Sequence, residues 1–142
     1  MERIIKNISA LKALVPELLA AAGNRKKWCF YGDLGSGKTT LIKAIAAQLG
    51  IQEEVTSPTY SLINEYEYIE ETTKQSFLAF HMDLYRLKTI EEALDIGIED
   101  YLERSEYCFM EWPELIEPLL PEDVVKITIE IVKDSERKIV FL

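Results

Sequence analysis

The sequence contains few of the residues that bind metal ions or form disulfides. Its 142 residues include one histidine and two cysteines, and no CxxC or Cys/His ligand spacing occurs. Cys29 and Cys108 each lie inside a short apolar run. We therefore expect both cysteines to be reduced residues of the hydrophobic core rather than metal ligands or nucleophiles.

Long hydrophobic runs are also absent. No apolar run approaches the ~20 residues needed to span a bilayer, and residues 1–4 do not begin the hydrophobic segment of a signal peptide. We therefore expect a cytoplasmic location and no membrane partner.

Basic residues are scarce. There are 16 lysines and arginines against 25 aspartates and glutamates, which gives a formal net charge of −9. This balance argues against this chain alone holding a nucleic-acid backbone, which requires a basic surface. It is compatible with binding a basic patch on another protein, but composition alone favours acids that simply keep the surface solvated.

The sequence shows no boundary between domains. It has no internal repeat, no low-complexity tract and no linker rich in Gly, Pro or Ser. Its hydrophobic fraction of 48% and charged fraction of 29% are ordinary for a globular protein. A chain of this length can bury roughly two-thirds of the surface that its unfolded form exposes. We expect residues 1–142 to form one domain.

The N-terminal part predicts a strand followed by a helix. Residues 3–8 could be an edge strand. Ser9 is typical of an N-cap, and the leucines that follow are spaced as one helical face up to a stop at Gly23. Pro16 lies inside this run and could kink the helix.

The C-terminal part predicts mainly strands. Thr89 and Glu92 are typical of a capping box, which opens a helix expected to end near Gly97. We expect strands at residues 60–68, 76–85, 107–110, 124–131 and 138–142, with hairpin turns at residues 70–75 and around residues 134–135.

A glycine-rich motif carries the strongest signal. Residues 32–39 have the form G-x-x-x-x-G-K-T, after a short apolar run at residues 28–31 and before a helical pattern that ends at Gly50. Glycines let the backbone turn tightly, so that successive N–H groups can point at phosphate oxygens, and the helix start adds the positive end of its dipole. Lys38 can reach the β- and γ-phosphates, and the Thr39 hydroxyl is placed to bind Mg²⁺.

The strand, loop and helix order is the context that a phosphate-binding P-loop requires, and it disfavours a chance match. We therefore predict an α/β fold, a P-loop NTPase-like three-layer sandwich with a mixed central sheet. The expected nucleotide-binding residues are Asp33, Leu34, Gly35, Ser36, Gly37, Lys38, Thr39 and Thr40.

Two carboxylates are candidates for the metal and for catalysis. Asp83 and Glu111 each end a predicted strand, and a P-loop site needs a carboxylate near its Mg²⁺ at such a position. Either could hold the metal, and the other could orient or deprotonate the attacking water. Each could instead only cap a strand or pair with Arg86.

Other polar residues near these motifs have more ordinary alternatives. The loop at residues 56–59 could sense the nucleotide or be a plain turn. His81 alternates with Asp83, and we expect a packed or hydrogen-bonded histidine rather than a catalytic one. Trp112 could lie beside the nucleotide or a partner. The acids within residues 91–106 could form a solvated helix face or a docking surface.

Taken together, these motifs resemble the TsaE (YjeE) family, small bacterial ATPases of tRNA threonylcarbamoyladenosine synthesis. The resemblance covers residues 11–131. It depends on the P-loop, on Ser-Pro-Thr-Tyr at residues 57–60, on His-Met-Asp-Leu-Tyr-Arg at residues 81–86 and on Glu-Trp-Pro at residues 111–113. The P-loop alone would be generic, whereas its combination with the last two motifs is specific.

The resemblance implies a function that composition does not show. Members bind ATP and Mg²⁺, hydrolyse ATP slowly when alone, and associate with the TsaB–TsaD heterodimer, in which TsaD transfers the threonylcarbamoyl group to adenosine 37 of tRNAs reading codons that begin with A. ATP hydrolysis is thought to reset that complex. Contact with tRNA is then expected only indirectly, through the complex. By position, Thr39 and Glu111 are then the metal-side residues, Asp83 is needed for hydrolysis, and Thr59 lies in the nucleotide-sensing loop.

Two other functions remain open. A small-molecule kinase would usually close an arginine-bearing lid over the phosphates, but of the five arginines only Arg86 lies next to a motif. A nucleotide switch that does not depend on turnover would look similar in sequence. ATP is favoured over GTP because no NKxD-type guanine motif follows the P-loop.

Overall fold

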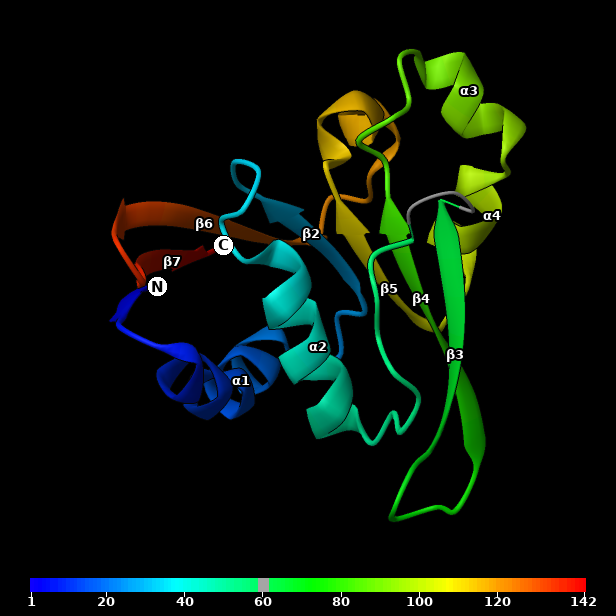
Figure 1. Ribbon diagram of the computed structural model, residues 1–142. Coiled ribbons are helices and arrows are strands. Elements are labelled where there is room, and N and C mark those ends of the chain that lie inside the picture. The colour runs from blue at the N-terminus through cyan, green and yellow to red at the C-terminus, as the bar shows by residue number, and fades with distance from the viewer. Residues whose placement is uncertain (59–61) are drawn as a thin grey trace.

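The computed structural model describes residues 1–58 and 62–142 of the chain. Its seven strands are β1 (Glu2–Ile5), β2 (Lys27–Tyr31), β3 (Ile63–Ile69), β4 (Ser76–Asp83), β5 (Tyr107–Glu111), β6 (Val125–Lys133) and β7 (Glu136–Phe141). They form one sheet in the order β1-β7-β6-β2-β5-β4-β3 (Figure 1). The pairings of β6 with β2, β2 with β5 and β5 with β4 are parallel, and the outer pairings are antiparallel. The predicted mixed sheet is confirmed.

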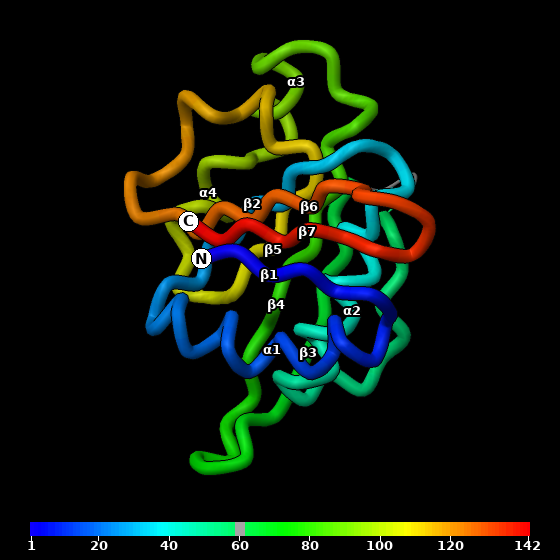
Figure 2. The backbone as a smooth tube through the Cα atoms, turned by 90° about the vertical axis from the view of Figure 1, so that its left-hand side faces the viewer, coloured from blue at the N-terminus to red at the C-terminus, as the bar shows by residue number. Residues whose placement is uncertain are grey.

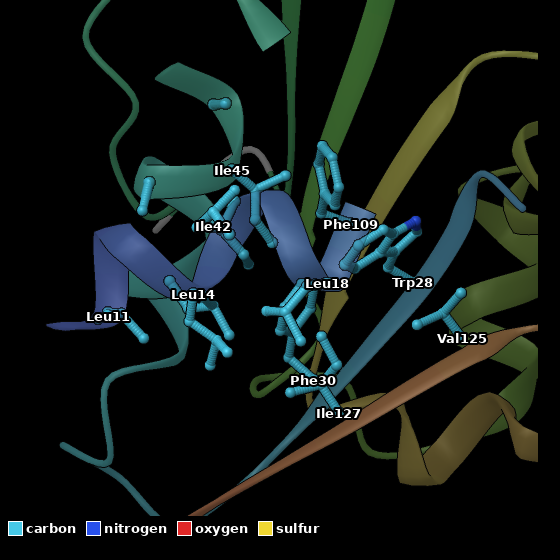
Figure 3. Close-up of a cluster of buried hydrophobic side chains, with 14 of the residues drawn as sticks. Leu11, Leu14, Leu18, Trp28, Phe30, Ile42, Ile45, Phe109, Val125 and Ile127 are labelled. Carbon is cyan, nitrogen blue, oxygen red and sulfur yellow. The ribbon is translucent and has the colours of Figure 1, made fainter. Parts of the chain in front are cut away.

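Helices cover both faces of this sheet. They are α1 (Ile8–Ala22), α2 (Lys38–Leu49), α3 (Ile90–Asp95), α4 (Ile98–Glu103) and the 3-10 helix η1 (Pro113–Leu119). On one face, α1 and α2 contribute Leu18 and Ile45 to a buried cluster that also contains Phe30 of the sheet (Figure 3). On the other face, α4 and η1 contribute Ile98 and Ile116 to a second cluster. The fold is therefore the predicted three-layer sandwich.

Strand β2 lies at the centre because its sequence is apolar on both sides. Trp28, Cys29 and Phe30 are all fully buried. Trp28 and Phe30 belong to the cluster under α1 and α2, whereas Cys29 belongs to the opposite cluster. A continuous apolar run of this kind is what a parallel strand covered on both faces requires. This central position delivers the glycine motif to the carboxyl-terminal edge of the parallel strands.

Helix α1 begins earlier than the sequence predicted. Its N-cap is Asn7, whose side chain accepts a hydrogen bond from the Ala10 N–H at 2.8 Å, so the Ser9 N-cap was wrong. Both residue types cap well, but here the extended backbone lies at Asn7 and Ser9 is already helical. The helix continues through Pro16 and ends at Gly23 as expected.

The C-terminal half contains more helix than predicted. The Thr89 hydroxyl accepts from the Glu92 N–H, which confirms the N-cap, but α3 ends at Asp95 and Gly97 then opens α4, a second helix that the sequence analysis did not separate. Helix η1 was also missed. Both predicted hairpins are present. The predicted strand that begins at Tyr60 is observed from Ile63, and residues 59–61 lie outside the described part of the chain.

The two ends of the chain lie side by side (Figure 2). Strand β1 pairs antiparallel with β7, and the Met1 ammonium donates to the Phe141 carbonyl at 3.1 Å. This pairing brings the start of α1 and the β6–β7 hairpin next to the glycine loop, as the residues lining a shared cavity show below.

Candidate functional site

The glycine loop joins the end of β2 to the start of α2 (Figure 1). A Cβ at Gly32 would lie 2.6 Å from the Ser36 Oγ and 2.7 Å from the Ile129 carbonyl oxygen, so no other residue fits there without movement. Gly37 is the N-cap of α2 at φ 110°, and no side chain caps the helix. The first N–H groups of α2 therefore lack a side-chain acceptor, which is the arrangement that favours an anion at a helix start.

Lys38 folds back over this loop. Its Nζ donates to the Gly32 carbonyl at 2.5 Å and to the Asp33 carbonyl at 3.3 Å. The same ammonium lies 3.7 Å from the centre of the Trp112 ring, a cation–π contact. Burial lowers the pKa of Lys38 from its ordinary value, and the nearby carboxylates, Glu111 first among them, oppose that shift. The ammonium is thus held at the centre of the loop, within reach of whatever anion the loop binds.

The two candidate carboxylates lie directly opposite each other. Asp83 of β4 pairs with Glu111 of β5 in the parallel register. Glu111 is 3% exposed, and its two carboxylate oxygens accept from the Thr39 hydroxyl at 2.9 and 3.0 Å. The Ser57 hydroxyl donates to Asp83 at 2.9 Å, and the Tyr85 N–H donates to the other Asp83 oxygen at 3.1 Å.

Trp112 follows Glu111 in an unusual backbone conformation. Its φ is 56°, in the left-handed region that bulky side chains rarely adopt. Its ring lies 4.9 Å from the Tyr85 ring, centre to centre, in addition to covering Lys38. Strained positions of this kind persist where the surroundings fix them and are common at functional sites. That Trp112 lies beside a nucleotide stays a prediction.

His81 of β4 has a buried side chain that contacts Glu111 of the neighbouring strand β5. It is 1% exposed, and its Nε2 lies 2.6 Å from a Glu111 carboxylate oxygen. The prediction of a hydrogen-bonded histidine is thereby confirmed. Arg86, the alternative partner for either carboxylate, is exposed.

One cavity of about 260 Å³ is lined by most of the residues predicted to bind the nucleotide. Seven of the eight predicted nucleotide-binding residues line it, together with both carboxylates. Asp33 is not among the lining residues, and its carbonyl accepts a hydrogen bond from Lys38. The lining residues are Leu34, Gly35, Ser36, Gly37, Lys38, Thr39, Thr40, Ser57, Asp83, Glu111 and Trp112. Thr59, predicted to sense the nucleotide, lies outside the described residues.

The donor set fits Mg²⁺ better than a metal bound by protein alone. Among residues 1–58 and 62–142, no three His, Cys, Asp or Glu side chains are grouped as a metal site. Mg²⁺ commonly takes one or two protein oxygens and completes its shell with phosphate and water. The Thr39 hydroxyl and the Glu111 carboxylate, in contact with each other, are such a pair.

A second cavity of about 270 Å³ lies on the other side of the glycine loop and was not predicted. It is lined by Asn7, Ile8 and Thr40 from the helix starts and by Arg137 from β7, with Ile5, Leu11, Gly35, Ser36, Gly37, Ile129, Ser135 and Ile139. Arg137 Nε donates to the Ser36 carbonyl at 3.0 Å, which joins the β6–β7 hairpin to the loop. No local sequence pattern predicts this cavity, because its lining combines residues near both ends of the chain with the glycine loop.

The fold of this chain is shared with a known protein structure, and its sequence matches a known family. The sequence model of the family described as threonylcarbamoyl adenosine biosynthesis protein TsaE matches residues 5–139. The chain belongs to the TsaE family. It is thus a member of a family with a P-loop-like fold, as expected of a nucleotide-binding protein.

Individual relatives agree with this assignment. The TsaE protein of Bacillus subtilis is 40% identical over 78% of this chain and 65% of its own length, and that of Treponema pallidum is 38% identical over 76% of this chain and 75% of its own. The crystal structure of Bacillus subtilis YdiB matches 99% of this chain and 83% of its own with a TM-score of 0.75 at 31% identity. The chain thus spans about two-thirds of the length of some curated relatives. No helix in the described part of the chain is long and apolar enough to cross a bilayer.

Proposed function

We propose that this protein binds ATP with Mg²⁺, hydrolyses it slowly, and serves the formation of the threonylcarbamoyl group on adenosine 37 of tRNAs that read codons beginning with A. It acts in the cytoplasm by binding the TsaB–TsaD heterodimer and resetting it between turnovers. The observation that carries the proposal is the contact of Thr39 with Glu111 in the same cavity as the glycine loop and Lys38.

The polyphosphate binds along the loop. The free N–H groups at the start of α2 meet the phosphate oxygens, and Lys38 exchanges its loop carbonyls for the β- and γ-phosphates. The exchange requires little further desolvation of the Lys38 ammonium, because that group is already partly buried beneath Trp112. The Thr39 hydroxyl and the Glu111 carboxylate hold Mg²⁺, which neutralises charge on the phosphates.

The base lies in the second cavity. Thr40 and residues 35–37 line both cavities, so a nucleotide that crosses the loop reaches from one into the other. The second cavity is lined by aliphatic side chains and by polar groups that include Asn7, Thr40 and Arg137, which suits a flat heteroaromatic ring with polar edges. ATP is preferred to GTP because the sequence lacks an NKxD-type guanine motif.

Asp83 serves the hydrolytic step. It lines the phosphate cavity opposite Glu111 and is bonded to Ser57 of the loop that follows α2. From this place its carboxylate can orient or deprotonate the attacking water. We assign Glu111 to the metal and Asp83 to the water because, within the described part of the chain, the Thr39 hydroxyl contacts Glu111 and not Asp83.

The biological role rests on the relatives. Proteins similar to this chain are named for tRNA threonylcarbamoyladenosine biosynthesis. With a net charge of −9, this chain is unsuited to hold tRNA by itself, and tRNA is met through the partner complex.

A capture experiment tests the proposal. Tagged protein is incubated with purified TsaB and TsaD in the presence of ATP, ADP or no nucleotide, with Mg²⁺ in each. We expect capture that depends on the nucleotide, together with slow release of phosphate. Phosphate transfer to a small-molecule acceptor instead of water would support the kinase alternative, and failure to capture the pair in any nucleotide state would overturn the proposed role.

A further inference from the structure

His81 reaches Glu111 across two neighbouring strands. In the register of β4 with β5, His81 lies opposite Phe109, and Glu111 lies opposite Asp83. The imidazole therefore meets Glu111 on the diagonal, with its Nε2 2.6 Å from the carboxylate. Both side chains are almost fully buried, so this contact is shielded from water.

The imidazole is poorly explained by packing alone. Within the described part of the chain, its Nδ1 is buried and has no hydrogen-bond partner. Its neighbours on the same face, Ala79 two residues before it and Phe109 opposite, are apolar core residues. An aliphatic side chain would fill this place without burying an unsatisfied nitrogen. The contact of Nε2 with Glu111 is therefore what explains a histidine at this position.

The hydrogen bond from His81 Nε2 fixes the orientation of the Glu111 carboxylate. A carboxylate only accepts hydrogen bonds, so Nε2 carries the hydrogen of this contact. The Thr39 hydroxyl has a single hydrogen and lies about equally far from both Glu111 oxygens, so it does not by itself select one orientation. The His81 bond makes the two oxygens different: Oε2 contacts both the ring and the Thr39 hydroxyl, whereas Oε1 contacts the hydroxyl alone within the described part of the chain.

We propose that His81 is a positioning residue that orients the Glu111 carboxylate for Mg²⁺. The proposal rests on the proposed function, because it assigns His81 a role in the metal site of that function. His81 is not among the residues that line the phosphate cavity. It acts through Glu111, in the way that hydrogen-bonded partners of metal ligands commonly do.

The first test is spectroscopic and needs no activity. His81 is the only histidine, so the imidazole signals of ¹⁵N-labelled protein are unambiguous. We expect an Nε2-bound proton protected from exchange in the intact protein and lost in Glu111→Ala. A signal that is unchanged in Glu111→Ala would show that the pair does not form and would overturn the proposal.

The second test separates positioning from packing. His81→Leu removes the donor, whereas His81→Gln keeps an amide N–H near the place of Nε2. We expect ATP affinity without Mg²⁺ to be unchanged in both, and the Mg²⁺ concentration for half-maximal effect to rise about tenfold or more in His81→Leu, the usual scale for loss of such a partner. His81→Gln should recover most of this loss. Met82→Leu, in the opposite core, is the matched control and should match the intact protein.

The outcomes are separable. A His81→Leu variant that folds and keeps its Mg²⁺ dependence would overturn the proposal while the proposed function stands. If His81→Leu does not fold, the imidazole signal decides: an Nε2 proton that is protected in the intact protein and lost in Glu111→Ala supports the proposal, and one that is unchanged in Glu111→Ala overturns it. If the intact protein shows no Mg²⁺-dependent ATP binding, the proposed function fails and the assignment of His81 to a metal site fails with it, while the imidazole signal still reports the pair.

Discussion

Glu111 lies directly opposite Asp83, yet the two carboxylates are held by different partners. Glu111 accepts from Thr39 at the start of α2, whereas Asp83 accepts from Ser57 in the loop that follows the same helix. Both hydroxyl partners line the same phosphate cavity, so the two like charges on adjacent strands are held by separate donors. The proposed function assigns a separate task to each acid.

The hydroxyl of Thr39 is expected to be required for the metal. Thr39→Val keeps the branched shape but removes the oxygen that meets Glu111. We expect the Mg²⁺ dependence of ATP binding, measured by calorimetry with and without the metal, to weaken by about tenfold or more. Thr39→Ser retains the hydroxyl and serves as the control, and equal behaviour of the two variants would remove Thr39 from the metal site.

Asp83→Asn should separate binding from turnover. The amide keeps the size of the side chain and can still bond to Ser57, but it is no longer a base. We expect ATP affinity close to that of the intact protein, loss of phosphate release, and failure to support repeated rounds of tRNA modification. Continued rounds of modification without hydrolysis would instead favour a switch that works by nucleotide binding alone.

Gly32→Ala should destabilise the protein through a steric clash. The added Cβ would meet the backbone oxygen of Ile129 at 2.7 Å, which a side-chain rotation cannot relieve. We expect a loss of about 1–3 kcal/mol in the free energy of unfolding, measured by urea denaturation. Gly23→Ala is the control, since Gly23 also has a positive φ but open space around it. Equal losses in the two variants would assign the effect to backbone strain rather than to the close approach.

The buried cysteines should make stability fall at alkaline pH. Burial raises the pKa of both Cys29 and Cys108 from 9.0 to about 12. A pKa raised on folding contributes stability that is complete below the unfolded value and is lost as pH rises between about 9 and about 12.

The free energy of unfolding, measured by urea at about pH 8 and about pH 10, should fall by about 1 kcal/mol for each cysteine. A Cys29→Ala/Cys108→Ala variant should lack this part of the fall. If the free energy of unfolding fell equally with pH in the intact protein and in the variant, the thiols would not be the cause of the fall.

The sequence predicted the phosphate loop well because its structure is local. The glycines of residues 32–37 and the helix after Lys38 determine the turn through neighbouring residues only. Asp83 and Glu111 were found for a related reason, since each ends an apolar strand and the ends of parallel strands meet at one edge. That these residues bind ATP and Mg²⁺ stays a prediction.

Features that depend on distant pairing were not found. The bond between His81 and Glu111 requires the register of two strands that are 30 residues apart. The cavity beside Arg137 requires the chain ends to pair. The N-cap of α1 was misplaced because Asn7 and Ser9 are both good caps, and only the packed helix selects between them.

Lys38 is the single side chain on which phosphate binding should depend most. Lys38→Ala deletes the ammonium aimed at the β- and γ-phosphates, whereas Lys43→Ala removes an exposed charge from the same helix outside the phosphate cavity. Isothermal titration of ATP with Mg²⁺ into the intact protein and both variants tests the account most directly. The account predicts saturable binding that Lys38→Ala loses almost completely and Lys43→Ala keeps. Near-normal ATP binding by Lys38→Ala would contradict it.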